Sequence, residues 1–115
     1  MTLTTNLKHV TTETELTTLI NAEENVMVCC GRMGPMCVPV YDVMEGLEKS
    51  GNYDQVQFRD MAFDSPESLY IRQLPEAANF RGLPFTIYFK NGQVAEATSS
   101  IQDKNQVTAI LEKVF

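Results

Sequence analysis

The order of helical and extended segments in this chain predicts an α/β fold with a central mixed sheet of about four to five strands flanked by helices. The short apolar run Asn25–Cys30, set between polar stretches, is typical of a strand buried on both faces of a parallel sheet. The runs Phe85–Lys90 and Gln93–Ala97 flank an Asn91-Gly92 pair, which predicts an antiparallel hairpin with a type I′ turn. A parallel unit followed by a hairpin gives a mixed sheet.

The first half of the chain supplies two helices around the buried strand. Thr12 and Glu15 form a capping-box pattern ahead of apolar residues at helical spacing, which predicts a helix over about 12–22. After a Gly- and Pro-containing loop over 31–36, apolar residues recur every three or four positions from Cys37 to Ser50, which predicts a second helix.

The second half begins with a predicted strand over Val56–Asp64, followed by a helix start with Pro66 near its first position. Pro75 breaks this helix before a short helical turn over Glu76–Phe80. After the hairpin, Asp103 caps a last helix with one apolar stripe. The expected order is therefore α-β-α-β-α-β-β-α.

The composition bounds the class of protein. The chain has 115 residues, 43% of them hydrophobic, which fits a single domain over 1–115. Its net charge of −6, without a basic run, argues against nucleic acid as a partner. It shows neither a secretory signal nor an apolar run of membrane-spanning length, so we expect a cytoplasmic protein without membrane contact. A monomer is expected.

The three cysteines, Cys29, Cys30 and Cys37, fall within nine positions. With His9 they make a nominal set of four zinc ligands, but they lack the Cys-x₂₋₄-Cys spacing of zinc sites. We therefore expect no metal and no cofactor.

The segment Arg81–Gly92, together with the order of elements, resembles the thioredoxin family, which carries an Arg-Gly-(Ile/Val)-Pro-Thr segment, an apolar strand and a Lys-Asn-Gly hairpin. The resemblance covers almost the whole chain, except that about 65–78 is longer by roughly half a dozen residues. It implies a thioredoxin fold and a cis peptide bond at Pro84, a geometry found at only about 5–6% of X–Pro bonds.

The family's Trp-Cys-x-x-Cys motif is absent. An alignment without gaps sets Cys37 on the second cysteine, Gly34 on the first and Met33 on the tryptophan. The family's buried acid falls on Val28, and the lysine that faces it falls on Asp60. The motif matters because a helix N-terminus stabilises the first thiolate and the second thiol resolves the mixed disulfide.

Three roles stay open for the thiols. Cys29 and Cys30 are adjacent in a strand, so their side chains point to opposite faces, and we expect Cys29 in the core and Cys30 near the base of the loop. Cys30 and Cys37 could then form a redox pair, since a loop of this length can bring their Cα atoms to about 5.5 Å. Alternatively Cys37 acts as a single thiol, stabilised by the helix start near Pro35 and by Arg32, or all three thiols are inert.

The resemblance implies a thiol–disulfide redox protein that exchanges disulfides with protein substrates through Cys37 and Cys30, with a thioredoxin-reductase-like reductant as a further partner. The alternative is a redox-inactive module that binds a protein partner through the groove at Pro84. Met36 joins Met33, Leu83 and Phe85 in an apolar patch that either docks a partner or covers the loop. The residues expected to contact substrate are Met33, Gly34, Pro35, Leu83, Pro84 and Phe85.

Overall fold

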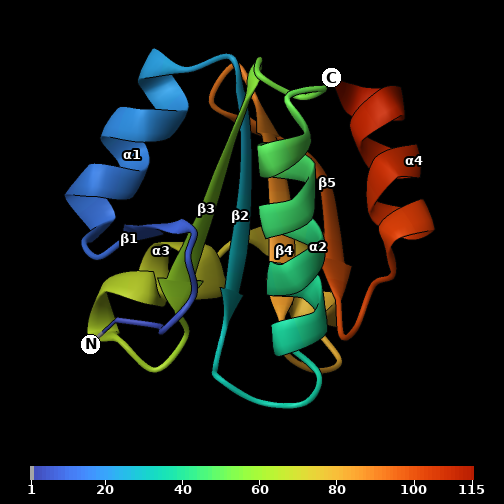
Figure 1. Cartoon of the computed structure of the whole chain (residues 1–115). Helices are drawn as coiled ribbons and strands as arrows, with labels where there is room; N and C mark the ends of the chain where they lie inside the picture. The colour runs from blue at the N-terminus through green and yellow to red at the C-terminus, as the bar shows by residue number, and fades with distance from the viewer. Residues whose placement is uncertain (1) are drawn as a thin grey trace.

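The computed structural model describes residues 2–115, and its centre is one five-stranded sheet in the order β1-β3-β2-β4-β5 (Figure 1). The strands β1, β3 and β2 are parallel, whereas β4 and β5 form the antiparallel edge. This mixed sheet with flanking helices confirms the predicted fold class. The strands are β1 (Lys8–Val10), β2 (Asn25–Gly31), β3 (Val56–Ala62), β4 (Phe85–Lys90) and β5 (Gln93–Ser99).

The helices lie on both faces of the sheet. Leu16 and Ile20 of α1 and Ile71 of α3 bury side chains on one face, and α2 and α4 cover the other. Figure 1 shows α2 in front of the sheet with α4 beside it. The helices are α1 (Glu13–Ala22), α2 (Val38–Ser50), α3 (Leu69–Arg72) and α4 (Lys104–Val114), with 3₁₀ turns at Pro66–Ser68 and Pro75–Asn79.

Two elements differ from the sequence-based expectation. The strand β1 was not predicted, because it is only three residues long and only Val10 of the three is buried. The helix expected after Asp64 forms a 3₁₀ turn and the four-residue α3, since Pro66 and Pro75 leave little chain between them for regular helix.

The predicted hairpin is present. Asn91 and Gly92 have φ values of 53° and 81°, the left-handed pair that a type I′ turn requires. The Asn91 N–H also donates to the Glu24 carbonyl oxygen at 2.8 Å, which ties the turn to the chain entering β2. This hydrogen bond holds the hairpin turn against the start of β2, the central strand of the sheet.

The alternation of side chains along β2 divides the core into two clusters. Met27 and Cys29 point to the α2 side, and Val28 and Cys30 point to the α1 side. We call these clusters the α2-side core and the α1-side core. None of the four side chains is exposed, so no thiol of β2 reaches the surface.

Asp60 is the one charged side chain among the described residues that is fully buried, and it lies on β3, between His9 of the edge strand β1 and Cys29 of β2. Its carboxylate accepts hydrogen bonds from the Thr5 hydroxyl and contacts the His9 Nδ1 atom at 2.7 Å. Burial raises the pKa of Asp60, with Glu45 adding to it, although the Thr5 and His9 contacts act in the opposite direction.

We expect the stability of the fold to depend on pH through Asp60. Because its pKa is raised in the folded chain, the folded chain holds a proton here at pH values where the unfolded chain, with a pKa of about 3.9, has lost it. The free energy of unfolding of the wild type should therefore fall, relative to that of Asp60→Asn, as the pH rises through this window. Urea denaturation of both proteins across a pH series measures the difference, and parallel curves would show that Asp60 does not titrate differently on folding.

None of the helices within residues 2–115 has the length and apolar character needed to cross a membrane.

Candidate active-site groove

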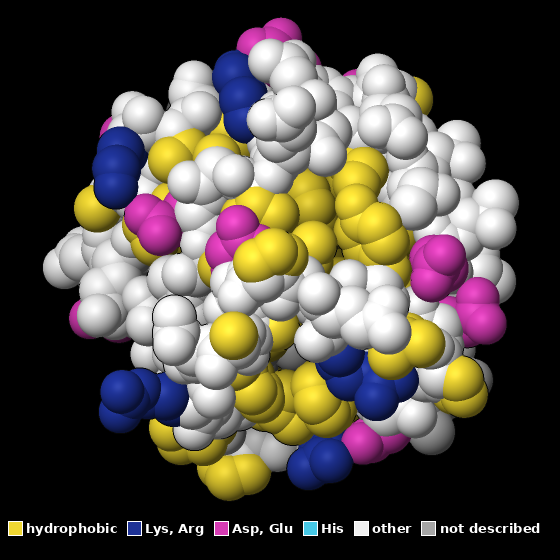
Figure 2. Space-filling model, turned by 180° about the vertical axis from the view of Figure 1, so that it is seen from behind, with side chains coloured by type: hydrophobic (Ala, Val, Ile, Leu, Met, Phe, Trp, Pro, Cys, Tyr) yellow, Lys and Arg dark blue, Asp and Glu magenta, His cyan; other side chains and the backbone are white. Residues whose placement is uncertain are grey.

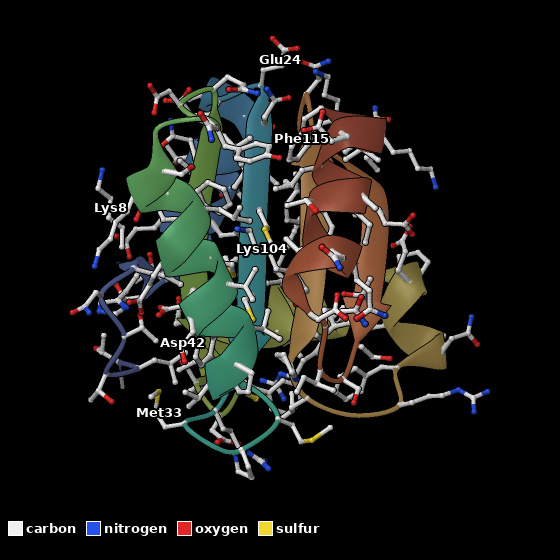
Figure 3. The ribbon with its side chains drawn as sticks, turned by 45° about the vertical axis from the view of Figure 1, so that its right-hand side comes forward. Lys8, Glu24, Met33, Asp42, Lys104 and Phe115 are labelled. Carbon is white, nitrogen blue, oxygen red and sulfur yellow. The ribbon has the colours of Figure 1, made fainter. Side chains whose placement is uncertain are left out.

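The loop between β2 and α2 lies at the end of the sheet where the parallel strands β2 and β3 finish. Figure 3 shows Met33 projecting from this loop, with Asp42 above it on α2. Ligands of open α/β sheets bind at the carboxyl ends of the strands, so this loop is the natural place for a site.

Cys37 is the N-cap residue of α2 and is only 3% exposed. Its sulfur accepts a hydrogen bond from the Arg32 N–H at 3.4 Å, across the loop. The first amides of α2 are directed toward this end of the helix, where their dipoles favour negative charge. The Cys37 side chain makes no capping hydrogen bond to these amides, so within residues 2–115 the Arg32 N–H is the one donor to its sulfur.

Gly31 allows the groups of the site to converge. A Cβ atom at this position would lie 2.7 Å from the Tyr41 hydroxyl, 2.9 Å from the Cys37 sulfur and 3.1 Å from Pro84 Cβ. The Tyr41 hydroxyl donates to the Arg32 carbonyl oxygen at 3.1 Å. The missing side chain at Gly31 thus brings β2, α2 and the segment before β4 together behind the loop.

A groove of about 440 Å³ opens beside Cys37. One wall comes from the loop, and the other from the segment that leads into β4. The peptide bond between Leu83 and Pro84 is cis, and within residues 2–115 the backbone N–H and C=O of Leu83 have no hydrogen-bond partner. The lining is mostly apolar: Arg32, Gly34, Pro35, Met36, Cys37, Phe63, Phe80, Gly82 and Leu83.

Comparison with known proteins finds relatives by structure alone; no family model and no curated protein matches the sequence. The thioredoxin of Malassezia sympodialis superposes with a TM-score of 0.75 at 16% identity, over 99% of this chain and 95% of that one. Oxidised thioredoxin from Plasmodium falciparum gives 0.73 at 21% identity, over 94% and 97%. This chain has the thioredoxin fold. Mitochondrial thioredoxin 3 of Saccharomyces cerevisiae gives 0.69 at 18% identity, over 94% and 92%.

On this thioredoxin fold the predicted pairing of Cys30 with Cys37 needs correction. The two adjacent strand cysteines do point to opposite faces, but Cys30 lies in the α1-side core, whereas Cys37 shares the α2-side core with Cys29. All three thiols are free and buried. Cys29 is buried in the core as predicted, but Cys30 is buried as well, on the face away from Cys37, because helices cover both faces of β2.

The register of the sheet shows which residue of β2 lies beside Asp60, the position on which the ungapped alignment set the family's lysine. Asp60 pairs with Cys29, while Val28 pairs with Arg59. The residue of β2 that faces Asp60 is therefore Cys29, whose sulfur accepts a hydrogen bond from the Thr86 hydroxyl at 3.6 Å.

The two thiols of β2 are poorly suited to act as thiolates. Burial raises the pKa of Cys30 to about 12, and Arg72 only partly offsets it. Burial also raises the pKa of Cys29 well above that of an ordinary thiol. Cys37 is the cysteine that lines the groove. Thiol chemistry at this groove therefore has to use Cys37.

The predicted substrate contacts separate into three groups. Gly34, Pro35 and Leu83 line the groove. Met33, 46% exposed, projects from the loop outside the lining, and Pro84 is buried behind Leu83 against Gly31. Phe85 does not contact the groove: as the first residue of β4 it points into the α1-side core and packs edge-on against Phe80.

Sequence reasoning missed the far wall of the groove. Phe63 and Phe80 stack at 5.9 Å between ring centroids, and both line the groove. The signal for Phe63 was its place directly after β3, since the residues that follow parallel strands meet at one edge of the sheet. Phe80 could not be placed, because it follows directly on the stretch 65–78 that is longer than in the family, so its position along the fold was not fixed.

Proposed function

We propose that this chain is a thioredoxin-like thiol–disulfide redox protein that binds an extended segment of a protein substrate in the groove and reacts through Cys37. The observation that carries the proposal is the position of Cys37: it is the N-cap of α2 and lines an apolar groove whose other wall holds Leu83 and the cis peptide bond. The thioredoxin fold supports redox chemistry of this type.

The backbone of Leu83 supports the binding step. Its free N–H and C=O can pair with an extended chain, as a strand edge does when it takes up a peptide. The apolar lining, including the 44% exposed Met36, would cover the side chains that flank the substrate's cysteine.

The chemical step is thiol–disulfide exchange. The Cys37 thiol gives its proton to solvent, and its thiolate attacks one sulfur of a substrate disulfide, forming a mixed disulfide and releasing the other substrate sulfur as a thiolate. A thiolate of an external dithiol reductant then attacks the mixed disulfide at the Cys37 sulfur, which frees the reduced substrate and leaves Cys37 bonded to the reductant. The second thiolate of the reductant attacks the reductant's own sulfur in that bond, so the reductant ends as a disulfide and Cys37 leaves as a thiolate. The resolving thiol comes from outside the chain, because Cys30 faces the opposite side of the sheet.

A second function is favoured by the burial of Cys37. Its exposure of 3%, and the presence of Gly34 where the family has its exposed cysteine, fit a redox-inactive module that holds a partner in the same groove. In that case the groove binds its partner without covalent chemistry.

A peptide carrying one cysteine as its mixed disulfide with thionitrobenzoate distinguishes the two functions. We expect the wild type and Cys30→Ser to release thionitrobenzoate and to carry the peptide on Cys37 by mass spectrometry, and Cys37→Ser to do neither. If the wild type binds the peptide but forms no adduct, the redox proposal is wrong and the binding module is correct. Circular dichroism of each variant checks that it is folded.

A further inference from the structure

Two arginines lie close to the ring of Phe63. The guanidinium carbon of Arg32 lies 5.7 Å from the ring centroid, and that of Arg72 lies 5.6 Å from it. Both distances are within the range of a cation–π contact. Arg32 lines the groove itself, and Arg72 lines a smaller neighbouring pocket that shares the walls of Phe63 and Phe80 with the groove.

Arg32 is already neutralised. Its Nε and Nη2 atoms donate to the two carboxylate oxygens of Asp64, each at 2.8 Å. This bidentate geometry uses the Nε–Nη2 edge of the guanidinium, the edge that a ligand's carboxylate would need. Arg32 therefore adds little net charge to the groove.

Arg72 is different, because it is held in place by neutral groups alone. Its Nε donates to the Ser68 hydroxyl at 3.0 Å, and its Nη2 donates to the Ser65 carbonyl oxygen at 3.4 Å. Ser68 is fully buried, so the anchor is rigid. Among the ion pairs of residues 2–115, none includes Arg72. An exposed arginine with a fixed guanidinium and a free Nη1 loses little side-chain freedom when it binds a carboxylate.

Basic and apolar side chains also lie next to one another on the surface at this end of the molecule. Figure 2 shows Lys and Arg side chains on both sides of an apolar hollow at the lower edge of the molecule, the edge at which Figure 1 places the loop between β2 and α2. The chain as a whole carries a net charge of −6, and at this edge Asp64 neutralises Arg32 but forms no ion pair with Arg72.

We propose that the groove selects a protein segment that carries an Asp or Glu side chain beside the residue bound at Cys37, and that Arg72 is the specificity residue that receives this carboxylate. The inference names the substrate class for the groove of the proposed function. The apolar wall of Phe63 and Phe80 packs against the apolar side chains of the bound segment. The Nη1 atom of Arg72 donates a hydrogen bond to the carboxylate of its Asp or Glu. The net negative charge of the chain repels an acidic ligand at long range, so it does not speed association. The preference for an acidic segment therefore comes from the contact with Arg72 and shows in a slower dissociation rate.

Peptides that have serine in place of cysteine test this without any redox step. Three fluorescent peptides of one length carry Glu, Gln or Lys beside the serine, and anisotropy gives their dissociation constants. We expect the wild type to bind the Glu peptide about two- to fivefold more tightly than the Gln peptide, the range of an exposed ion pair, and the Lys peptide most weakly. In Arg72→Gln the three should bind about equally, and Arg72→Lys should keep part of the preference.

Lys49→Gln is the matched control, because it removes the same charge from the last turn of α2, far from its N-terminal end at Cys37. It should keep the preference of the wild type. Equal binding of the Glu and Gln peptides by the wild type, or a preference that survives in Arg72→Gln, would overturn the proposal. A Glu preference without any Cys37 adduct would instead leave the acid selection standing and remove the redox function.

Discussion

Gly31→Ala is expected to lower the free energy of unfolding by about 1–3 kcal/mol, the cost of overpacking a close-packed site. The new methyl group would lie 2.7 Å from the Tyr41 hydroxyl and 2.9 Å from the Cys37 sulfur. Neither atom can retreat easily, since Tyr41 is 1% exposed and Cys37 is fixed at the start of α2. The loop should also move, so we expect Cys37 to become more reactive toward iodoacetamide.

Gly34→Ala provides the control within the same loop. A Cβ atom at Gly34 would meet nothing within 4 Å, so the substitution should leave stability unchanged or raise it by about 0.4–1 kcal/mol through the unfolded chain. Urea denaturation of the two variants and the wild type measures both effects. Equal stability of Gly31→Ala and Gly34→Ala would show that the close packing around Gly31 does not contribute to the free energy of unfolding.

The contrast between these two glycines shows where sequence reasoning ended. Both belong to a stretch that composition marks as a loop, and nothing in the sequence distinguishes a glycine with open space from one that two other segments approach. Local patterns did predict the elements with strong internal signals, such as the capping box of Asp103 and the turn at Asn91. The residues that make up each of these signals lie within a few positions of one another, so the sequence alone is enough to recognise them.

The site depended on longer-range information. The alternation of a strand placed Cys29 and Cys30 on opposite faces, but only the packed helices decide which face carries α2. The anchoring of Arg72 by Ser68 and its position over Phe63 depend in the same way on how the short 3₁₀ turn and α3 fold back beneath β3. A segment without regular periodicity offers no pattern from which such contacts follow.

Two buried tyrosines of the α2-side core give the second large effect, because only one of their hydroxyls has a partner. The Tyr41 hydroxyl donates to the Arg32 carbonyl oxygen, whereas among residues 2–115 the Tyr88 hydroxyl finds no hydrogen-bond partner. Removing a bonded hydroxyl costs about 0.5–1.5 kcal/mol, while removing an unpaired buried one costs nothing or stabilises the fold. Tyr41→Phe should therefore be less stable than Tyr88→Phe, although both changes delete the same atom.

The loss at Tyr41 should also be visible at Cys37. The carbonyl oxygen of Arg32 accepts the hydrogen bond from the Tyr41 hydroxyl, and the N–H of Arg32 donates to the Cys37 sulfur. Tyr41 therefore fixes the residue that contacts the thiol. Without it, the loop opens more readily; a weakening of about 1 kcal/mol corresponds to roughly fivefold faster alkylation of Cys37 by iodoacetamide. Mass spectrometry of the labelled residue gives the rate, with Tyr88→Phe expected to match the wild type. If both variants label at the wild-type rate, the hydroxyl of Tyr41 stabilises the core without holding the loop, and access to Cys37 is set by the groove itself.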